Sequence, residues 1–427
     1  MTCSRHMDGN KKQKIALGFH ACVDYELEWN LSSMEHLMEE CEVHAGELDS
    51  VGLNGVRQTG DTERIESMKG LMIEILSCMR QGTGCEIIPE DCGLCREFAK
   101  NFSYKITIGG TAARAAIAIG KIGYESTLGM CCFNQYMEDL LPAGITCYSG
   151  TGPDHDEVYP HIILQYPSGV HIQVNDIDFI TSCHNRILIS RDPDSMNMVI
   201  AEDFGNQAGD ADVFLLSCFS EVLDASILIK RLDTVFNLLA GIRDRAFVVL
   251  EDGCYVNGEF RRMVHRKLAP VLDVISMNED ELQDFVGKRI QILDPDQVLD
   301  GVSCVYRSLK VPLLIIHTHA WALAYGTGSH DLKEALEGGI MLASARYVYG
   351  DEFGTDEYRN IRTWNVNERG REFSKQVMEE DPMVCCIPCL DLEFAKRPTT
   401  VKRGEIRKQA KTLISSRFKD SGQTGYK

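Results

Sequence analysis

Residues 246–287 read AFVVLEDGCYVNGEFRRMVHRKLAPVLDVISMNEDELQDFVG. The two short apolar runs in this stretch predict buried strands, and each is followed by a segment with apolar residues at helical spacing. The same alternation runs from about residue 210 to residue 349. Strands alternating with helices favour right-handed βαβ units, so the predicted fold is α/β, with a doubly wound, mostly parallel sheet and helices on both faces.

The segments outside this alternation predict a second, smaller α+β domain. Residues 28–103 look mostly helical, residues 125–180 form short strands and turns, and the charged residues 350–385 look like surface loop. The predicted large domain has its first strand in 1–24 and takes in 109–150 and the nucleotide-binding part 191–427, while the smaller domain takes 25–108 and 151–190.

The composition argues against some partners. The chain has 427 residues and a formal net charge of −19, whereas a nucleic-acid or anionic-membrane partner would require a basic face. A local basic pocket for a phosphorylated ligand stays compatible with this charge. The polar N-terminus and the lack of long apolar runs predict a cytoplasmic protein.

The 17 cysteines are expected to be reduced thiols. Two CxxC pairs occur, Cys92/Cys95 and Cys386/Cys389, nearly three hundred residues apart. Zinc ribbons keep their two pairs much closer together, so free thiols are favoured over a zinc site.

Ligands of open α/β sheets bind beyond the carboxyl ends of the strands. Asp24 ends the run KIALGFHACVD (14–24) and can accept two hydroxyl hydrogen bonds, as a sugar site requires; the alternative is a helix cap or a surface acid. Gly109 and Gly110 join a strand to a helix, where they let the backbone approach a ligand and present amide N–H groups. They could equally be needed only for the turn.

Acidic and amide side chains follow the next strands. Glu251 ends a run that should be buried, and Asn278 and Glu281 are three residues apart across a strand-to-helix junction. Carboxylate and amide oxygens are the ligands that Mg²⁺ prefers, usually with waters and phosphates. The alternative is a helix start in which Asn278 is the N-cap and acids favour the helix dipole.

The turn TTVKRGEIRK (399–408) places Gly404 and Glu405 at a helix N-terminus. Backbone amides there can stabilise a transferring phosphoryl group, and the acid can take the proton from an attacking hydroxyl. An ordinary acidic first turn is the alternative.

Together these segments resemble the ADP-dependent glucokinase/phosphofructokinase family of the ribokinase-like superfamily. The resemblance includes IGGTAARAA (108–116), SMNEDEL (276–282) and RPTTVKRGEI (397–406). It implies a ribokinase-like fold with a lid domain, and a transferase of carbohydrate metabolism and glycolysis that moves phosphate from ADP to a sugar hydroxyl and releases AMP.

The resemblance also implies roles for particular residues. Asp24, Gly109 and Gly110 would contact the sugar, and Asn278 and Glu281 match an N-x-x-E motif that orders Mg²⁺ and phosphate. In NRILIS (185–190), Arg186 is the lid arginine expected to contact phosphate. Glu86 in GTGCEI (82–87) matches a lid glutamate that favours glucose, slightly, over fructose 6-phosphate.

Two motifs depart from the family pattern. The H-x-E motif falls on residues 249–251, where Glu251 is present but Val249 replaces the histidine. The G-x-G-D motif falls on residues 402–405, where Lys402 replaces the first glycine and Glu405 the catalytic aspartate. Glu405 is one methylene longer, and catalytic positioning is sensitive at about 1 Å. The alternative function is therefore a catalytically impaired member that binds sugar or nucleotide without efficient turnover.

Overall fold

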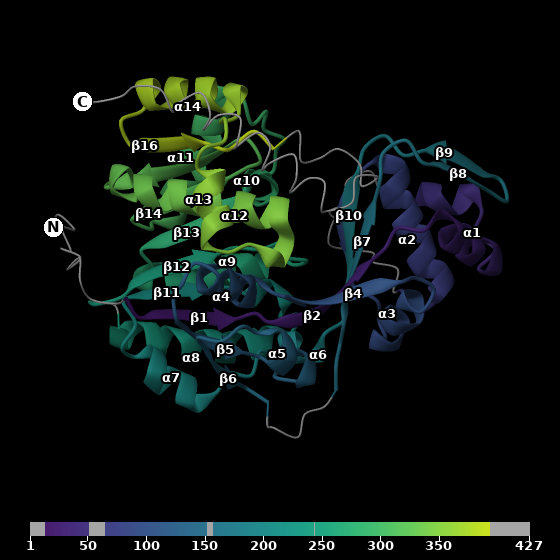
Figure 1. Ribbon diagram of the computed structural model, residues 1–427, viewed down its shortest axis with the longest axis horizontal. Helices are drawn as coiled ribbons and strands as arrows, with labels where there is room; N and C mark the ends of the chain where they lie inside the picture. The colour runs from purple at the N-terminus through teal and green to yellow at the C-terminus, as the bar shows by residue number, and fades with distance from the viewer. Residues whose placement is uncertain (1–12, 51–64, 152–156, 243, 393–427) are drawn as a thin grey trace, which may run out of the picture.

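The computed structural model of the protein describes residues 13–50, 65–151, 157–242 and 244–392. Two sheets organise these residues, and Figure 1 shows them side by side, each with its own helices. Within the described residues, no helix combines the length and the apolar character that a membrane span needs.

The larger sheet has nine strands in the order β16-β15-β14-β13-β12-β11-β1-β5-β6. Every neighbouring pair from β14 to β6 is parallel, and β15 and β16 add an antiparallel edge. The bounds are β1 Ile15–Phe19, β5 Ser126–Met130, β6 Ile145–Ser149, β11 Val213–Leu216, β12 Phe247–Glu251, β13 Val274–Asn278, β14 Leu313–His317, β15 Trp321–Gly326 and β16 Val384–Pro388. The prediction of a mostly parallel sheet is confirmed.

Helices cover both faces of this sheet. Successive side chains of a strand point to opposite faces, and β1 accordingly sends Ala16 into one apolar cluster and Leu17 into another. The first cluster holds residues of α7 to α11 and α14, and α4 and α12 lie on the other face. The bounds are α4 Thr111–Gly120, α5 Gln135–Leu140, α6 Pro193–Asn197, α7 Glu202–Ala208, α8 Ala225–Ile242, α9 Gly258–Leu268, α10 Glu279–Val286, α11 Pro295–Leu309, α12 Lys333–Tyr349, α13 Thr355–Ile361 and α14 Glu368–Glu380.

The prediction of a surface loop over residues 350–385 is wrong, because α13, α14 and the start of β16 lie there. Phe373 and Val377 are four residues apart on α14 and both are buried. The Phe373 ring stacks on Trp321 of β15 with their centroids 4.7 Å apart. Most residues of α14 are charged because they face solvent, so its few buried apolar residues give only a weak helical pattern in the sequence.

The smaller sheet has five strands in the order β3-β10-β7-β2-β4. The helices α1 Leu31–Glu40, α2 Met68–Gln81 and α3 Cys92–Ala99 pack with it around a separate apolar cluster. The strands are β2 Cys22–Leu27, β3 Cys85–Ile87, β4 Tyr104–Gly109, β7 His161–Tyr166 and β10 Asn185–Ile189, and β8 His171–Val174 pairs with β9 Ile177–Ile180 in a hairpin. The predicted smaller α+β domain is thus present.

The apolar run 14–24 is two strands rather than one. β1 ends at Phe19 in the large sheet, and β2 begins at Cys22 in the small sheet. Asp24 therefore lies inside β2, opposite Thr107 of β4, instead of just past the end of a strand. One continuous apolar run was misread because it is buried first by one sheet and then by the other.

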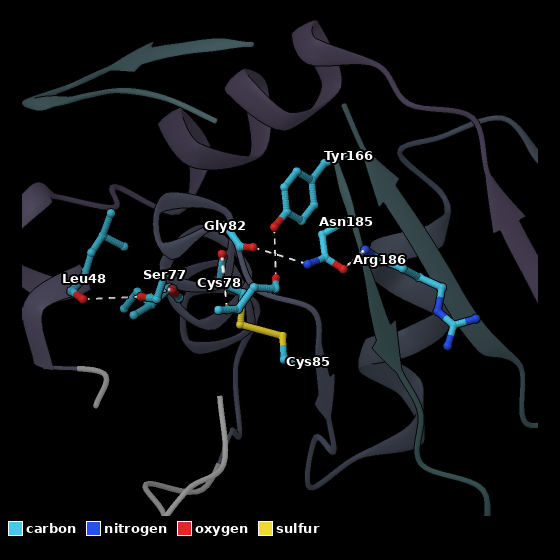
Figure 2. The surroundings of a disulfide bond; sticks show 10 residues. Leu48, Ser77, Cys78, Gly82, Cys85, Tyr166, Asn185 and Arg186 are labelled. Atoms are coloured by element: carbon cyan, nitrogen blue, oxygen red, sulfur yellow. Dashed lines mark hydrogen bonds between the residues drawn. A yellow bond between two sulfur atoms is a disulfide. The ribbon is translucent and has the colours of Figure 1, made fainter. Parts of the chain in front are cut away.

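Cys78, at the end of α2, forms a disulfide with Cys85, at the start of β3 (Figure 2). The prediction that the cysteines are reduced is wrong for this pair. Nearby contacts hold the connecting turn, since Tyr166 donates to the Thr83 carbonyl at 2.9 Å and Asn185 donates to the Gly82 carbonyl at 3.2 Å. The disulfide thus fixes the strand that carries Glu86 to the helical layer.

Candidate active site

Three polar side chains meet at the carboxyl ends of β12, β13 and β14. These strands are adjacent and parallel, so Glu251, Asn278 and His317 end at the same edge of the large sheet. The Nε2 atom of His317 lies 3.0 Å from Oε1 of Glu251. Burial alone would lower the pKa of His317, but its hydrogen bond to Glu251 and the charge of Glu251 outweigh this effect and raise it.

Asn278 and Glu281 form a capping box at the start of α10. Asn278 Oδ1 accepts from the N–H groups of Asp280 and Glu281, each at 2.9 Å, and Glu281 Oε2 accepts from the Asn278 N–H at 2.8 Å. The helix-start reading of this motif is therefore realised. Burial, followed by the charges of Asp252 and Glu251, raises the pKa of Glu281 to about 7, so this edge carries an excess of negative charge.

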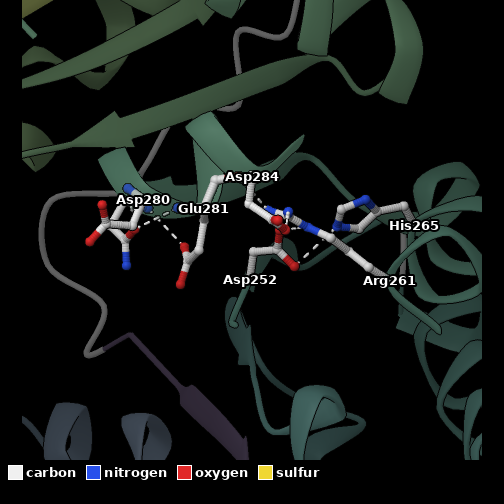
Figure 3. A network of polar contacts seen from close by, with 7 residues as sticks. Asp252, Arg261, His265, Asp280, Glu281 and Asp284 are labelled. Atoms are coloured by element: carbon white, nitrogen blue, oxygen red, sulfur yellow. Dashed lines mark hydrogen bonds and ion pairs between the residues drawn. The ribbon is translucent and has the colours of Figure 1, made fainter. Parts of the chain in front are cut away.

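A buried ionic network supports this edge from behind (Figure 3). Arg261 of α9 donates to Asp252 at 2.6 and 2.8 Å, to Asp284 at 2.9 Å and to the Glu281 carbonyl at 2.9 Å. His265 Nε2 lies 3.1 Å from Asp252. The network ties the turn after β12 to the first turns of α10, and no motif in the sequence pointed to it.

The predicted sugar residues come together on β2, β4 and α4. Asp24 Oδ2 accepts from Arg114 at 3.0 Å. A Cβ atom added at Gly109 would lie 2.0 Å from Asp24 Oδ1, so glycine is needed there. Gly110 has φ of 84°, and a Cβ there would lie 2.5 Å from the His20 carbonyl oxygen. Both glycines thus keep the space around Asp24 and the start of α4 open.

Glu86 of β3, in the small sheet, is affected by charged groups of both sheets. Glu86 keeps an exposed side chain, and partial desolvation, followed by the charge of Glu221, raises the pKa of its carboxyl against the opposing charges of Arg186 and His161. Glu221 belongs to the turn that follows β11 of the large sheet. Glu86 and Arg186 therefore face the carboxyl edge of the large sheet from the smaller one.

The sequence did not single out a third group of side chains. His161 Nε2 lies 3.3 Å from Asp192, and both side chains are buried. Burial would lower the pKa of His161, but the hydrogen bond that His161 donates to Asp192 and the charge of Asp192 outweigh it and raise the pKa to about 9. The ring of His20 lies 5.9 Å from that of His161, and burial, followed by the charge of His161, lowers the pKa of His20 to about 4. The sequence signal that could have indicated this group was His20, a polar residue inside the otherwise apolar run 14–24.

The predicted catalytic residues Gly404 and Glu405 lie outside the described residues. Of the other predicted site residues, Glu251, Asn278 and Glu281 form one group, and Asp24, Gly109 and Gly110 form another. Glu86 and Arg186 lie on neighbouring strands, β3 and β10.

The fold is α/β, with a large, mostly parallel sheet covered by helices on both faces and a smaller α+β domain, as predicted. The chain belongs to the family described as the ADP-specific phosphofructokinase/glucokinase conserved region, whose model matches residues 13–399. No curated protein matches the chain in a sequence comparison.

Solved structures share the fold at low identity. A hypothetical ADP-dependent phosphofructokinase from Pyrococcus horikoshii OT3 is 16% identical with a TM-score of 0.67, over 96% of this chain and 99% of that one. A phosphofructokinase from the same organism, with AMP, is 15% identical with a TM-score of 0.69 over the same shares. An ADP-dependent kinase in complex with fructose-6-phosphate and ADPβS is 12% identical with a TM-score of 0.68, over 93% of this chain and 92% of that one.

Proposed function

We propose that the protein is an ADP-dependent sugar kinase, which transfers the terminal phosphoryl group of ADP to a sugar hydroxyl and releases AMP. The observation that carries the proposal is that two groups of polar side chains, one on each sheet, lie on neighbouring parts of the fold. The group around Asp24 lies on the small sheet and the acidic group around Glu281 lies on the large one, and the charge of Glu221 on the large sheet acts on Glu86 of the small sheet. Membership of the ADP-specific family supports ADP as the donor.

Asp24 would hold the sugar. Arg114 donates to Oδ2 of Asp24 and the Cys22 thiol donates to Oδ1, so sugar hydroxyls would use the remaining lone pairs of an oriented carboxylate. The missing side chain of Gly109 leaves room beside Oδ1, and the Gly110 backbone lies at the start of α4. A carboxylate held by an arginine is already oriented, so less conformational entropy is lost when the sugar binds.

Glu251, Asn278 and Glu281 would organise Mg²⁺ and its waters. These are hard oxygen donors, and burial, with a smaller contribution from the charges of Asp252 and Glu251, raises the pKa of Glu281, so a bound cation would favour its ionised form. Bound Mg²⁺ neutralises charge on the donor phosphates. His317, held 3.0 Å from Glu251, would position that carboxylate and takes the place of the histidine missing from the H-x-E motif.

Glu405 would act as general base on the attacking hydroxyl, and the amides of Gly404 and Glu405 would stabilise the transferring phosphoryl group. Arg186 would contact a phosphate from the small domain. Closure of the small domain, with the predicted boundaries 25–108 and 151–190, over the large domain of 1–24, 109–150 and 191–427 would exclude water from the reaction.

Glucose is the proposed acceptor, by a small margin over fructose 6-phosphate. A carboxylate at Glu86 suits hydroxyl groups, whereas the phosphate of fructose 6-phosphate would have to approach both Glu86 and Glu221. A pKa of about 7 for Glu86 also lets its protonated form donate a hydrogen bond near neutral pH.

The proposed setting is glycolysis in the cytoplasm. A stable disulfide is unusual in a cytosolic protein. The redox state of Cys78 and Cys85, measured after rapid thiol blocking in cells, therefore tests this location: a fully oxidised pair contradicts it.

The altered 402–405 motif favours a second candidate, a family member that binds both ligands without efficient turnover. An AMP-release assay on the full chain, with ADP or ATP and with glucose or fructose 6-phosphate, separates the two. The kinase proposal expects turnover with ADP and Mg²⁺ that Glu405→Gln lowers about 10²-fold or more, with binding retained. The matched control Glu259→Gln changes an exposed acid on α9 and should leave turnover unaltered.

The other outcomes are equally informative. Binding of both ligands without turnover, together with some recovery in the double variant Lys402→Gly/Glu405→Asp, supports the second candidate. Turnover with ATP but not ADP refutes the proposed donor. Activity that survives Glu405→Gln refutes the proposed base.

A further inference from the structure

His20, Cys22 and His161 bring three metal-ligating atoms together where the chain passes from one sheet to the other. Two imidazole nitrogens and the Cys22 sulfur all lie within 4.8 Å of one another. Cys22 begins β2 and His161 begins β7, and these strands pair in parallel with Asp24 opposite His161. The topology of the small sheet thus builds the cluster from residues about 140 positions apart.

His20 has a ring nitrogen without a hydrogen-bond partner among the described residues. Nε2 of His20 is buried and unpaired within the described part of the chain. A buried polar atom left unpaired costs about 1–3 kcal/mol, so native structures rarely keep one without a reason. A metal ion at this point would satisfy the lone pair.

The second histidine is held as metal-bound histidines are. His161 contacts Asp192 at 3.3 Å, and Asp192 is itself fixed by the Ser195 hydroxyl at 2.8 Å. A carboxylate behind a histidine sets the ring orientation and makes the other nitrogen a better donor. Both members of this pair are buried, so the arrangement is rigid.

The surroundings favour a cation. Asp24, Asp192 and Glu221 all act on the Cys22 thiol, and Asp24 Oδ1 lies 3.4 Å from its sulfur. Arg114 pairs with Asp24 and His161 pairs with Asp192, so the charge left for an ion to balance is that of Glu221 and of a Cys22 thiolate. A divalent ion would therefore balance a local excess of negative charge.

We propose that His20, Cys22 and His161 bind a zinc-class transition metal, with a fourth position open toward Asp24. Zinc bonds of about 2.0–2.3 Å require ligand atoms about 3.3–3.8 Å apart, so ligand atoms that lie within 4.8 Å of one another need to close by at most about 1.0–1.5 Å. On binding, the Cys22 sulfur and one ring nitrogen of His161 each form a metal bond, and the proton that each carries leaves to solvent. Imidazole and thiolate donors select zinc, cobalt or copper over Mg²⁺, so this site is distinct from the hard oxygen site at Glu281.

Occupancy would have a consequence for the sugar. A metal beside Asp24 would compete for the carboxylate that is proposed to hold the sugar hydroxyls. Zinc would then inhibit the kinase by weakening sugar binding. This consequence rests on the proposed function, whereas the metal site itself does not.

Metal binding to the full chain tests the site directly. Zn²⁺ affinity is measured by competition with a chromophoric chelator, and Co²⁺ substitution reports a thiolate ligand by its charge-transfer absorption. One ion per chain with thiolate absorption is expected, and Cys22→Ser should lower the affinity by about 100-fold or more. Control variants Cys95→Ser and Cys85→Ser, which test the CxxC segment and the disulfide pair, should bind as the wild type does.

Two further variants separate ligation from folding. His20→Gln removes a nitrogen that makes no hydrogen bond, so the fold should persist while zinc affinity falls. Asp192→Asn should weaken binding about 10-fold through His161. Absence of binding at micromolar Zn²⁺, or equal binding by the folded His20→Gln and Cys22→Ser variants, overturns the proposal. These measurements need no turnover, so they test the metal site even if the protein proves inactive on sugars. Inhibition by zinc that persists in Cys22→Ser contradicts only the proposed competition between zinc and the sugar for Asp24.

Discussion

His317 and Glu251 lie 3.0 Å apart, although 66 residues separate them in the chain. One ends β14 and the other ends β12, with β13 between them. The imidazole that the local H-x-E pattern lacks at Val249 is thus supplied from another strand. Because the charge of His317 depends on pH, its hydrogen bond with Glu251 should contribute to the stability of the protein in a pH-dependent way.

His317→Gln tests this pair. The pKa of His317 is raised in the folded protein, so the stabilisation is fully present below the unfolded pKa of about 6.5 and is lost as the pH rises through the folded value. Because His317 keeps partial solvent contact, we expect a loss of about 0.5–1 kcal/mol at pH 6 that vanishes in alkaline solution. Urea unfolding at both pH values measures it.

The matched control is His319→Gln. His319 is more exposed and lies 3.6 Å from Glu279, so its removal should change the free energy of unfolding by less than about 0.5 kcal/mol. Equal losses for His317→Gln at acidic and alkaline pH would show that the charge of His317 contributes nothing.

Glu281→Gln should stabilise the protein while impairing its proposed metal site. The folded pKa of about 7 lies above the unfolded value, so ionisation of Glu281 lowers stability above pH 7, and this loss is relieved as the pH falls from 7 toward 4.5. Glutamine keeps the acceptor for the Asn278 N–H. We expect a gain of about 1–3 kcal/mol at pH 8 and little change at pH 4.5.

Calorimetry provides the second readout for Glu281→Gln. Loss of Mg²⁺-dependent ADP binding, in a variant that is more stable at pH 8, fits the proposed role. Unchanged Mg²⁺-dependent binding would leave Glu281 as a helix-start residue only. Glu279→Gln, in the same first turn, is the control and should leave both measurements nearly unchanged.

The alternating part of the fold was predictable because its signals are local. The helices Gly258–Leu268 and Pro295–Leu309 begin and end where the apolar spacing, the caps and the turn residues indicate. The strand ends at Glu251 and Asn278 follow from the same alternation. These features depend on neighbours within a few residues, which one sequence displays.

Other features depend on contacts between distant segments. The apolar run 14–24 gives no sign that it changes sheets between Phe19 and Cys22, because burial by either sheet requires the same residue types. Positions 261 and 262 are both arginine, so the residue type does not distinguish them, yet Arg261 pairs with Asp252 whereas Arg262 pairs with Glu259. Likewise the pairing of His161 with Asp192 required the topology of the small sheet.

Arg261→Leu should be strongly destabilising. The side chain of Arg261 is 4% exposed and that of Asp252 is fully buried, so the substitution leaves a buried carboxylate with His265 as its remaining side-chain partner. Removal of one partner from a buried ion pair costs about 3–5 kcal/mol. Chemical denaturation measures the change, and the double variant Arg261→Leu/Asp252→Asn should recover part of it.

Arg262→Leu is the matched control for this network. Arg262 is 57% exposed and pairs with Glu259 one helical turn away, so the free energy of unfolding should change by less than about 0.5 kcal/mol. Similar losses for the two arginine variants would contradict the structural role assigned to the buried network.

Gly110→Ala and Gly120→Ala should have opposite effects. Gly110 has φ of 84°, and an added Cβ would lie 2.5 Å from the His20 carbonyl oxygen, so we expect a loss of about 2–3 kcal/mol. Gly120, in α4, has open space around its Cβ position, and alanine there should add about 0.5–1 kcal/mol. Thermal unfolding of both variants measures the contrast; a tolerated Gly110→Ala would mean that the turn can relax.

Gly109→Ala should act on ligand binding more than on the backbone. The added Cβ would lie 2.0 Å from Asp24 Oδ1, which belongs to a side chain, and φ at Gly109 is not in the left-handed region. Asp24 would therefore rotate away and lose its contact with Arg114, which now lies at 3.0 Å. If Asp24 holds the sugar, glucose affinity measured by calorimetry should fall about 10-fold or more, since loss of a hydrogen bond to a charged acceptor costs about 1.5–3 kcal/mol.

ADP affinity provides the internal control and should stay the same, because the proposed nucleotide groups lie on the large sheet. A fall in ADP affinity alone, with glucose binding intact, would place the sugar elsewhere and reject Asp24 as its anchor.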